Sequence, residues 1–282
     1  SRLMVAEAAE TKFEIGRTYV VEIDQFGGTR SQVEYYQSSN VGGLIVDDED
    51  VLMMSPGVLY SGTASSAADF AQILENRQHG QFRSFYDLPG SRGVVPVRGN
   101  DVSILLVPGS DGLVYPVQLM ANGLTKIRKP FGFIEEEVFF GGATEGHFLF
   151  AGVRSMVTVR RNDDARGYRR RVDGSIELVR AVGLATDRRS QHFIVVSTTA
   201  EGSRLTLYKD SGQIVELGHI DDPELNITAP FSPCAMDGDR VFVYSESGEA
   251  RSIRSYRIER DTIVFVGETP TSGKVTAMTI VR

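Results

Sequence analysis

The stretch HFIVVST at residues 192–198 decides the fold, because runs of the same kind recur along the chain at a nearly constant spacing. They begin at Val102 (VSILLVP), His147 (HFLFAGV) and Arg240 (RVFVYSE), so successive starts lie 45, 45 and 48 residues apart. A period of roughly 20 to 50 residues is typical of repeat proteins. This period has room for four short strands and their turns, which predicts a structure built from similar small sheets.

Each recurring run is followed by two further strand-like segments in a fixed order. The first of them alternates apolar and polar residues, as a strand with two different faces does; these segments are LVYPVQL (113–119), MVTVRR (156–161), RLTLYK (204–209) and SIRSYRI (252–258). A tight turn then leads to the second, and we predict these turns at Asn122-Gly123, Asp173-Gly174, Ser211-Gly212 and Arg260-Asp261. The glycine in the first three turns can adopt the positive φ of a hairpin loop.

The repeats predict an all-β protein, namely a β-propeller of about five to seven small antiparallel blades. We expect a single domain over residues 1–282, with its clearest repeats at 102–146, 147–191, 192–239 and 240–273. A β-sandwich is the alternative, because sandwiches also consist of short strands at regular spacing.

The two ends of the chain are predicted to share one blade. Residues 274–282 (KVTAMTIVR) read as a closing strand with no companion strands after it. The segment 17–24 (RTYVVEID) can supply outer strands for that blade, which would close the ring without a long unpaired edge. One short amphipathic helix is expected as an insertion at 65–77 (SSAADFAQILENR), which has a polar start followed by apolar residues at helical spacing.

Composition narrows the choice of partner. The formal net charge of −7 and the pI near 5.3 disfavour nucleic acid as a direct ligand, because its phosphate backbone attracts basic surfaces. No stretch approaches the roughly 18 consecutive apolar residues of a transmembrane helix, so no membrane span is expected. We therefore expect protein partners, in a larger or homo-oligomeric assembly.

The sequence lacks short signatures of catalysis, and on that ground the chain is predicted not to be an enzyme and to use no cofactor or metal. The Gly-x-Ser-x-Gly pattern of α/β-hydrolases is absent, and the four histidines show no short metal-ligand spacing. His147 and His192 occupy matching repeat positions, which predicts a shared structural role at a strand start, such as a hydrogen bond between blades. The acidic run Asp47–Asp50 is interpreted as a hairpin tip, with Ca²⁺ binding as the alternative.

The best candidate for partner binding is the segment 166–171, which reads Arg-Gly-Tyr-Arg-Arg-Arg in a chain that is otherwise acidic. Planar guanidinium groups beside a tyrosine suit a carboxylate, a phosphate or an acidic protein surface. The alternative is a solvated loop between strands. The residues predicted to bind the partner are Arg166, Tyr168, Arg169, Arg170 and Arg171.

A longer segment carries a resemblance to a known family. From Ser91 the chain reads SRGVVPVRGNDVSILLVPGSDGLVYPVQLMANGLTKI, and the upstream segment VLMMSPGVLYSG contains Pro56-Gly57. This arrangement resembles the packaged-DNA stabilisation proteins of short-tailed phages, in which a Ser-Arg-Gly-Val lead precedes a strand, a Gly-rich hairpin and a Gly-initiated strand. The matching positions here are 91–94, 112–115 and 123–127. The resemblance implies a propeller-bearing virion component that closes the head after packaging, below the portal ring.

Two functional hypotheses follow from the sequence. The first is a non-enzymatic structural or assembly protein that binds other proteins through propeller loops, with a phage head-to-tail connector or tail component as its most concrete form. The second is a propeller that recognises glycans or peptides, either as a binding protein or as a hydrolase. Pockets commonly form where the loops of several blades converge.

Overall fold

The computed structural model describes fourteen segments of the chain, and all of them are strands or turns without a helix. The segments are residues 1–8, 16–38, 43–47, 50–55, 58–63, 95–98, 103–108, 112–119, 125–127, 129–132, 136, 140–161, 168–228 and 231–281. The helix predicted at 65–77 lies outside the described residues, and so does the turn predicted at Asn122-Gly123.

The described strands form six sheets, four of which have four strands each. One of these four contains β12 (Phe140–Ala143), β13 (His147–Ala151), β14 (Ser155–Arg161) and β15 (Tyr168–Glu177). The next contains β16 (Ala181–Thr186), β17 (His192–Thr199), β18 (Gly202–Asp210) and β19 (Ile214–Asp222). A third contains β20 (Cys234–Asp237), β21 (Arg240–Ser247), β22 (Ala250–Glu259) and β23 (Thr262–Pro270).

The remaining three sheets include both ends of the chain. One has the order β24-β1-β2-β3 and is made of β1 (Arg2–Glu7), β2 (Gly16–Ile23), β3 (Thr29–Ser38) and β24 (Val275–Val281). A three-stranded sheet holds β4 (Gly43–Asp47), β5 (Asp50–Ser55) and β6 (Val58–Thr63). The last holds β7 (Val95–Arg98), β8 (Ser103–Pro108), β9 (Leu113–Leu119), β10 (Thr125–Ile127) and β11 (Phe131–Gly132).

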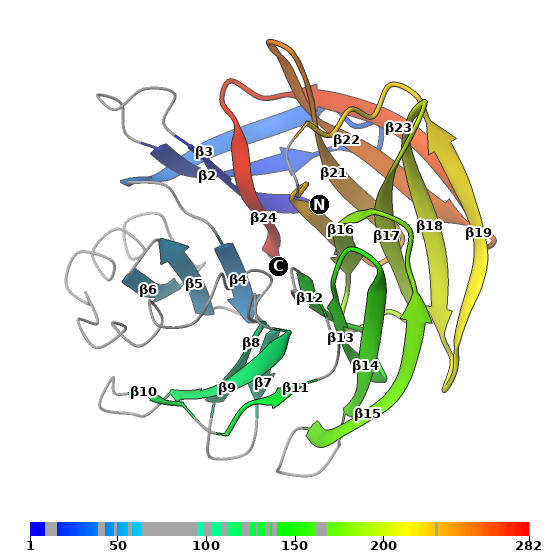
Figure 1. The fold of residues 1–282 in the computed structure, drawn as a ribbon. Helices are drawn as coiled ribbons and strands as arrows, with labels where there is room; N and C mark the ends of the chain where they lie inside the picture. Colours follow the sequence, from blue (N-terminus) through cyan, green and yellow to red (C-terminus); the bar gives the residue numbers. More distant parts are fainter. Residues whose placement is uncertain are drawn as a thin grey trace.

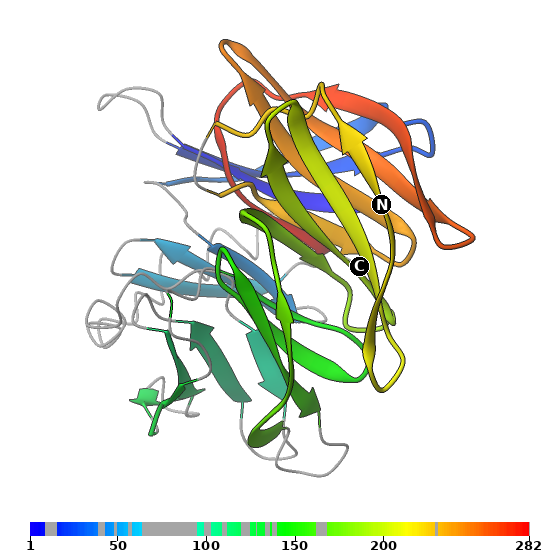
Figure 2. The same ribbon diagram turned by 45° about the vertical axis from the view of Figure 1, so that its right-hand side comes forward.

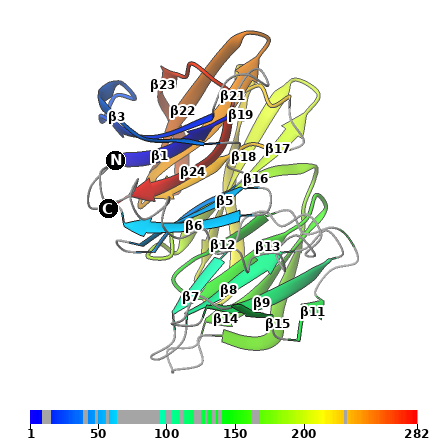
Figure 3. The same ribbon diagram turned by 90° about the vertical axis from the view of Figure 1, so that its left-hand side faces the viewer.

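The first strand of each sheet lies near the centre of a ring (Figure 1). These inner strands contact one another in the cyclic order β7, β12, β16, β20, β24, β4 and back to β7. Each sheet then extends outward, so that β15, β19 and β23 lie at the periphery in Figure 1. Figures 2 and 3 show the same ribbon turned by 45° and 90°. The fold is therefore a β-propeller, and the β-sandwich alternative is wrong because the sheets surround an axis rather than facing one another as a pair. The predicted number of blades stays a prediction, since residues 64–94 lie outside the described part of the chain.

One sheet joins the N-terminal and C-terminal ends of the chain. The inner strand β24 pairs antiparallel with β1, where Leu3 lies opposite Ile280, and β1 pairs on its other side with β2, where Leu3 lies opposite Val21. Leu3 is fully buried. Three strands from the start of the chain thus extend one sheet outward from the last strand, and the ring is closed by the pairing of β1 with β24.

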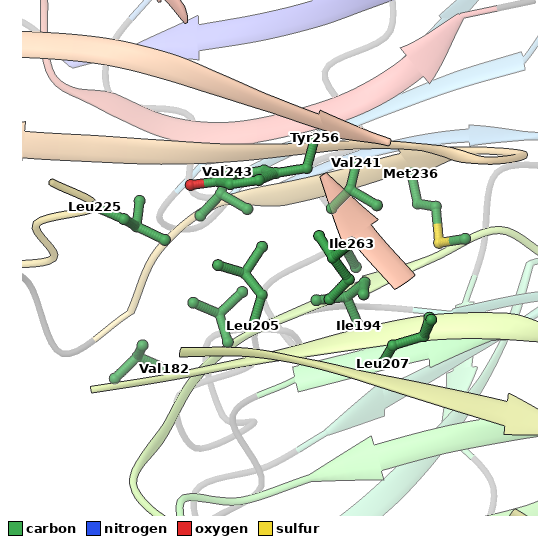
Figure 4. Close-up of a cluster of buried hydrophobic side chains, with 12 residues drawn as sticks. Val182, Ile194, Leu205, Leu207, Leu225, Met236, Val241, Val243, Tyr256 and Ile263 are labelled. Carbon is green, nitrogen blue, oxygen red and sulfur yellow. The ribbon is translucent and has the colours of Figure 1, made fainter. Parts of the chain in front are cut away.

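Apolar side chains fill the space between neighbouring sheets. Figure 4 shows the cluster between the sheet β16–β19 and the sheet β20–β23, in which Ile194 and Leu205 face Val241 and Tyr256. All four side chains are buried. The alternation along each strand directs successive residues to opposite faces of the sheet, so each sheet packs against both of its neighbours.

The inner strands need small residues because they converge near the axis. A Cβ atom added at Gly142 in β12 would come within 2.6 Å of Thr186 Cγ2 in β16. A Cβ atom added at Gly183 in β16 would come equally close, 2.6 Å, to Cys234 Sγ in β20. Contacts this short do not occur between real Cβ atoms. The close spacing of adjacent inner strands therefore requires glycine, which has no side chain, at these positions.

The sheets begin one strand earlier than the sequence repeats. The recurring runs at His147, His192 and Arg240 are β13, β17 and β21, which are the second strands of their sheets. Each sequence repeat thus holds three strands of one sheet and the inner strand of the next. The turns predicted at Ser211-Gly212 and Arg260-Asp261 are confirmed, with positive φ at Gly212, Arg260 and Asp261.

Candidate interaction surface

A buried histidine joins two neighbouring sheets on one face of the propeller, where β13 begins and β18 ends. His147 begins β13, and its Nδ1 atom lies 2.8 Å from Oδ1 of Asp210, the last residue of β18 in the next sheet. Its Nε2 atom lies 3.0 Å from Oδ2 of Asp173 in β15. Both His147 and Asp210 are almost completely buried, whereas the Asp173 side chain is 39% exposed. The prediction of a hydrogen bond between blades at His147 is confirmed.

The surroundings of His147 favour its charged form. The hydrogen bond to Asp210 raises the pKa of His147 above its ordinary value, and although burial opposes this, the contact with Asp173 adds to it. Burial disfavours charge on Asp210 as well, but hydrogen bonds from His147 and from the Thr144 hydroxyl outweigh it and lower the pKa of that carboxyl. Because a carboxylate only accepts hydrogen bonds, the ring satisfies both contacts as a donor only in its doubly protonated, positively charged form.

Side chains at the matching positions of the next two sheets also lie against the following sheet, across the seam between the two, although His192 Nε2 makes no hydrogen bond there. His192, at the start of β17, has Nε2 3.3 Å from Oδ1 of Asp261, which lies in the turn between β22 and β23. Arg240, at the start of β21, donates to the carbonyl oxygens of Ile23, at 3.1 Å, and of Asp24 at the turn between β2 and β3. In each case an ionisable side chain at the start of a second strand reaches the last residue of the third strand of the following sheet or the turn after it.

Asp173 reaches His147 because β15 bulges at this point. Thr158 pairs with Gly174 but Val159 pairs with Val172, so Asp173 is the extra residue with no partner opposite it on β14. The turn predicted at Asp173-Gly174 is therefore wrong, since both residues lie inside a strand. An extra residue bends the strand and redirects its side chain, and Oδ2 of Asp173 also accepts a hydrogen bond from Nε of Arg160, at 3.1 Å.

Arginines gather around this contact from two sheets. Arg160 and Arg161 end β14, and Arg188 and Arg189 lie in the turn between β16 and β17. The Arg161 guanidinium donates to the Arg188 carbonyl oxygen, at 2.9 Å, and to the Thr144 carbonyl oxygen, and it lies over the Phe148 ring. Arg160 and Arg189 are exposed. We call this group, together with β15 from Tyr168, the arginine end of the seam.

The segment predicted to bind a partner lies beside these arginines. Tyr168 is the first residue of β15 and pairs with Arg161, and Arg169, Arg170 and Arg171 follow it along the strand. The segment is thus the start of an outer strand, and the alternative of a solvated loop does not hold for Tyr168–Arg171. Arg166 lies outside the described residues. The sequence did not single out Arg188 and Arg189, because they lie about 20 residues further along the chain and only the ring brings them near.

Other candidate sites remain without support in the described part of the chain. No group of three or more histidine, cysteine, aspartate or glutamate side chains there is arranged to hold a metal ion. Asp47 and Asp50 pair with each other at the end of the β4–β5 hairpin, as a hairpin tip requires. Desolvation raises the pKa of Cys234 to about 12, which leaves its thiol protonated. Within the described ranges we also find no helix of the length and apolarity needed to cross a membrane.

Comparisons with known proteins identify the fold and no family. No protein-family model and no curated protein matches the chain. Among solved structures, TolB from Acinetobacter baumannii aligns with a TM-score of 0.59 and 12% identity, over 99% of this chain and 66% of its own. A candidate 6-phosphogluconolactonase from Bacteroides fragilis aligns with a TM-score of 0.58 and 10% identity, over 96% of this chain and 82% of its own.

A second candidate 6-phosphogluconolactonase, from Bacteroides uniformis, aligns with a TM-score of 0.54 and 12% identity over 96% of this chain and 82% of its own. Identities this low show a shared fold alone. The prediction that the chain is not an enzyme is nevertheless overturned as a conclusion from the sequence, because the same fold occurs in two candidate 6-phosphogluconolactonases. Propeller sites are assembled from loops of several blades, so the absence of a short catalytic signature excludes nothing. The chain is thus a β-propeller, a fold suited to binding other proteins, and its family stays open.

Proposed function

We propose that the chain is a six-bladed propeller that binds a protein partner through the arginine end of the seam. The observation that carries this proposal is the gathering of Arg160, Arg161, Arg188 and Arg189 beside the start of β15. These residues come from two sheets, and the buried contact between His147 and Asp210 fixes one sheet against the other. A surface held in this way presents its cations in a preorganised geometry, which lowers the entropic cost of binding.

The charge of the surface indicates the chemistry of the partner. The segment 166–171 adds four arginines to the four named above, in a chain of net charge −7. A local cluster of one sign in a molecule of the opposite sign favours docking in one orientation. Arginine also forms bidentate hydrogen bonds to carboxylates, so an acidic protein surface suits this end of the ring.

Paired sets of arginine variants test the proposal. Arg166, Arg169, Arg170 and Arg171 replaced together by alanine should weaken partner binding at least tenfold while the melting temperature stays nearly unchanged. Arg154 and Arg180 provide the control, because both are exposed and lie in turns at the opposite end of the ring. Equal weakening by both sets would indicate non-specific charge attraction and would contradict the proposal.

The more specific form of this function is closure of a phage head after packaging, with the chain in an oligomeric virion assembly. It rests on the resemblance of residues 91–127 and 51–62 to the packaged-DNA stabilisation proteins. A ring-shaped partner would present the same acidic patch several times, so weak contacts would add up. Electron microscopy of the chain mixed with candidate portal and tail proteins tests it, and a protein that stays monomeric and unbound in those mixtures would exclude it.

A sugar-lactone hydrolase is the second candidate function. The observation that favours it is the fold shared with two candidate 6-phosphogluconolactonases over more than nine-tenths of this chain. Hydrolysis of 6-phosphogluconolactone, followed by the acid it releases, tests it directly. A rate no faster than the spontaneous reaction at micromolar protein would exclude this activity.

A further inference from the structure

We propose that His147 is a proton switch for the N-terminal half of β15: while both ring nitrogens carry protons the Asp173 bulge is anchored, and loss of the Nε2 proton releases it. This inference rests on the proposed function in one respect only, because the released segment includes the residues predicted to bind the partner. It concerns the regulation of that surface by pH.

The geometry shows which proton is lost. His147 Nδ1 faces Asp210, whose side chain is 1% exposed and has no access to water to replace the bond. His147 Nε2 faces Asp173, which is 39% exposed and retains Arg160 as a second partner. A neutral imidazole has one N–H. The favoured neutral form therefore keeps its proton at Nδ1 and turns the lone pair of Nε2 toward a carboxylate oxygen.

The charged groups around the His147 imidazole do not compensate for the loss of its Nε2 proton. They are Asp210 from β18, Asp173 from β15 and Arg160, which is the cross-strand partner of His147 on β14. Arg161 is turned toward the carbonyl oxygens of Thr144 and Arg188. Two lone pairs held 3.0 Å apart repel, so Asp173 gains by moving toward water and Arg160 once the Nε2 proton is gone.

The start of β15 depends on this anchor because its pairing with β14 is sparse. From Ser155 to Thr158 each residue of β14 pairs with successive residues of β15, but beyond the bulge only Val159 pairs with Val172 and Arg161 with Tyr168. Four residues of β15 thus span the distance covered by two residues of β14. A segment with so few ladder contacts opens at low free-energy cost, and the contact of Asp173 with His147 adds to the Arg160 pair in tying its C-terminal end to the sheet.

Hydrogen exchange of the peptide 168–177, corrected for the intrinsic effect of pH, tests the proposal without any partner. Between pH 6 and pH 9 exchange should accelerate roughly tenfold for each unit by which the Asp173 contact raises the His147 pKa. In Asp173→Asn the neutral Nε2 accepts a hydrogen bond from the amide, so exchange should not accelerate. The matched control is Asp221→Asn, which removes an exposed carboxylate paired with Arg204 in another sheet and should behave as the wild type.

Acceleration of equal size in Asp173→Asn, or none in the wild type, would overturn the switch. Should Asp173→Asn fail to fold, the wild-type protein supplies a second measurement by NMR. The Cε1 proton of His147 and the amide of Gly174 should titrate with one shared midpoint above pH 6.5, and separate midpoints would also overturn the proposal. None of these readouts involves a partner, so their failure leaves the proposed function standing, and loss of partner binding alone leaves the switch standing.

Discussion

The Nδ1 atom of His147 lies 2.8 Å from Oδ1 of Asp210 across the boundary, or seam, between two neighbouring sheets. Only 5% of the His147 side chain and 1% of the Asp210 side chain are exposed to solvent. One repeat later His192 faces Asp261, and in the repeat after that Arg240 faces the turn at Asp24. The spacing of the apolar runs in the sequence is therefore also the spacing of side chains that reach the neighbouring sheet from the start of a second strand. In a ring, such contacts set the angle between neighbours as well as stabilising each pair.

The first prediction concerns the energetic weight of this seam. Asp210→Asn should destabilise the protein by about 3 kcal/mol, because it leaves a buried imidazolium without its counter-charge. The control Asp221→Asn breaks an exposed pair with Arg204 and should cost less than about 1 kcal/mol. Urea unfolding of the three proteins at pH 6 measures both. Similar losses in the two variants would show that burial of Asp210 adds nothing.

The second prediction concerns the dependence of stability on pH. The pKa of His147 is raised in the folded protein, so the stability it contributes is fully present below about pH 6.5 and is lost as the pH rises through the folded value. The pKa values of Asp210 and Asp173 are lowered, so their contribution is present above about pH 4 and is lost as the pH falls through the folded values.

The contact should accordingly stabilise the fold most between about pH 4 and pH 6.5. Measured as the free energy of unfolding in urea, the wild type should lose stability from pH 6.5 to pH 9. His147→Gln, which has no titrating group at this position, should be flatter over the same range. Parallel curves for the two proteins would assign the alkaline loss to other residues.

Several features of the seam could be predicted from the sequence because they repeat. His147 and His192 stand 45 residues apart at the start of similar apolar runs, and their structural role follows from that symmetry. The partner carboxylates could not be predicted in this way. Asp210 ends one strand, whereas Asp261 lies in a turn. That each of them faces the histidine of the preceding sheet becomes visible only once the sheets are placed side by side.

Two features of the fold were missed for physical reasons. Asp173-Gly174 has the composition of a hairpin turn, but the chain continues through it as a strand because the bulge gives Asp173 a buried histidine to contact. The inner strands β12 (FGGA) and β20 (CAMD) are short and rich in small residues, which weakens any β pattern. Crowding near the axis selects those residues, and crowding is a property of the ring rather than of the local sequence.

The third prediction tests that crowding. Gly183→Ala should destabilise the protein by about 1 to 3 kcal/mol, because the added methyl group meets Cys234 Sγ at 2.6 Å and the Ser232 carbonyl oxygen at 3.2 Å. Gly218→Ala is the matched control, since β19 is an outer strand and no atom lies within 4 Å of the added methyl group. It should change stability by less than about 1 kcal/mol or increase it. Thermal melting of both variants decides the matter, and a neutral Gly183→Ala would mean that the inner strands have room to separate.

The fourth prediction concerns the single cysteine at the same inner contact. Desolvation raises the pKa of Cys234 to about 12, and the thiol donates a hydrogen bond to the Ser232 carbonyl oxygen at 3.3 Å. Because the thiolate is the reactive form, the native protein should resist iodoacetamide at pH 8 for hours. The same reagent should modify one site per chain within minutes in denaturing urea.

A surface thiol supplies the comparison for that experiment. Ser211 lies in the exposed turn between β18 and β19, so Ser211→Cys should take up one label quickly in the folded state and a second only on unfolding. Mass spectrometry of the intact chain counts the labels. Prompt labelling of Cys234 in the native wild type would show that β16 and β20 separate on the timescale of the reaction, because the thiol must leave its contact with Gly183 and Ser232 before it can ionise.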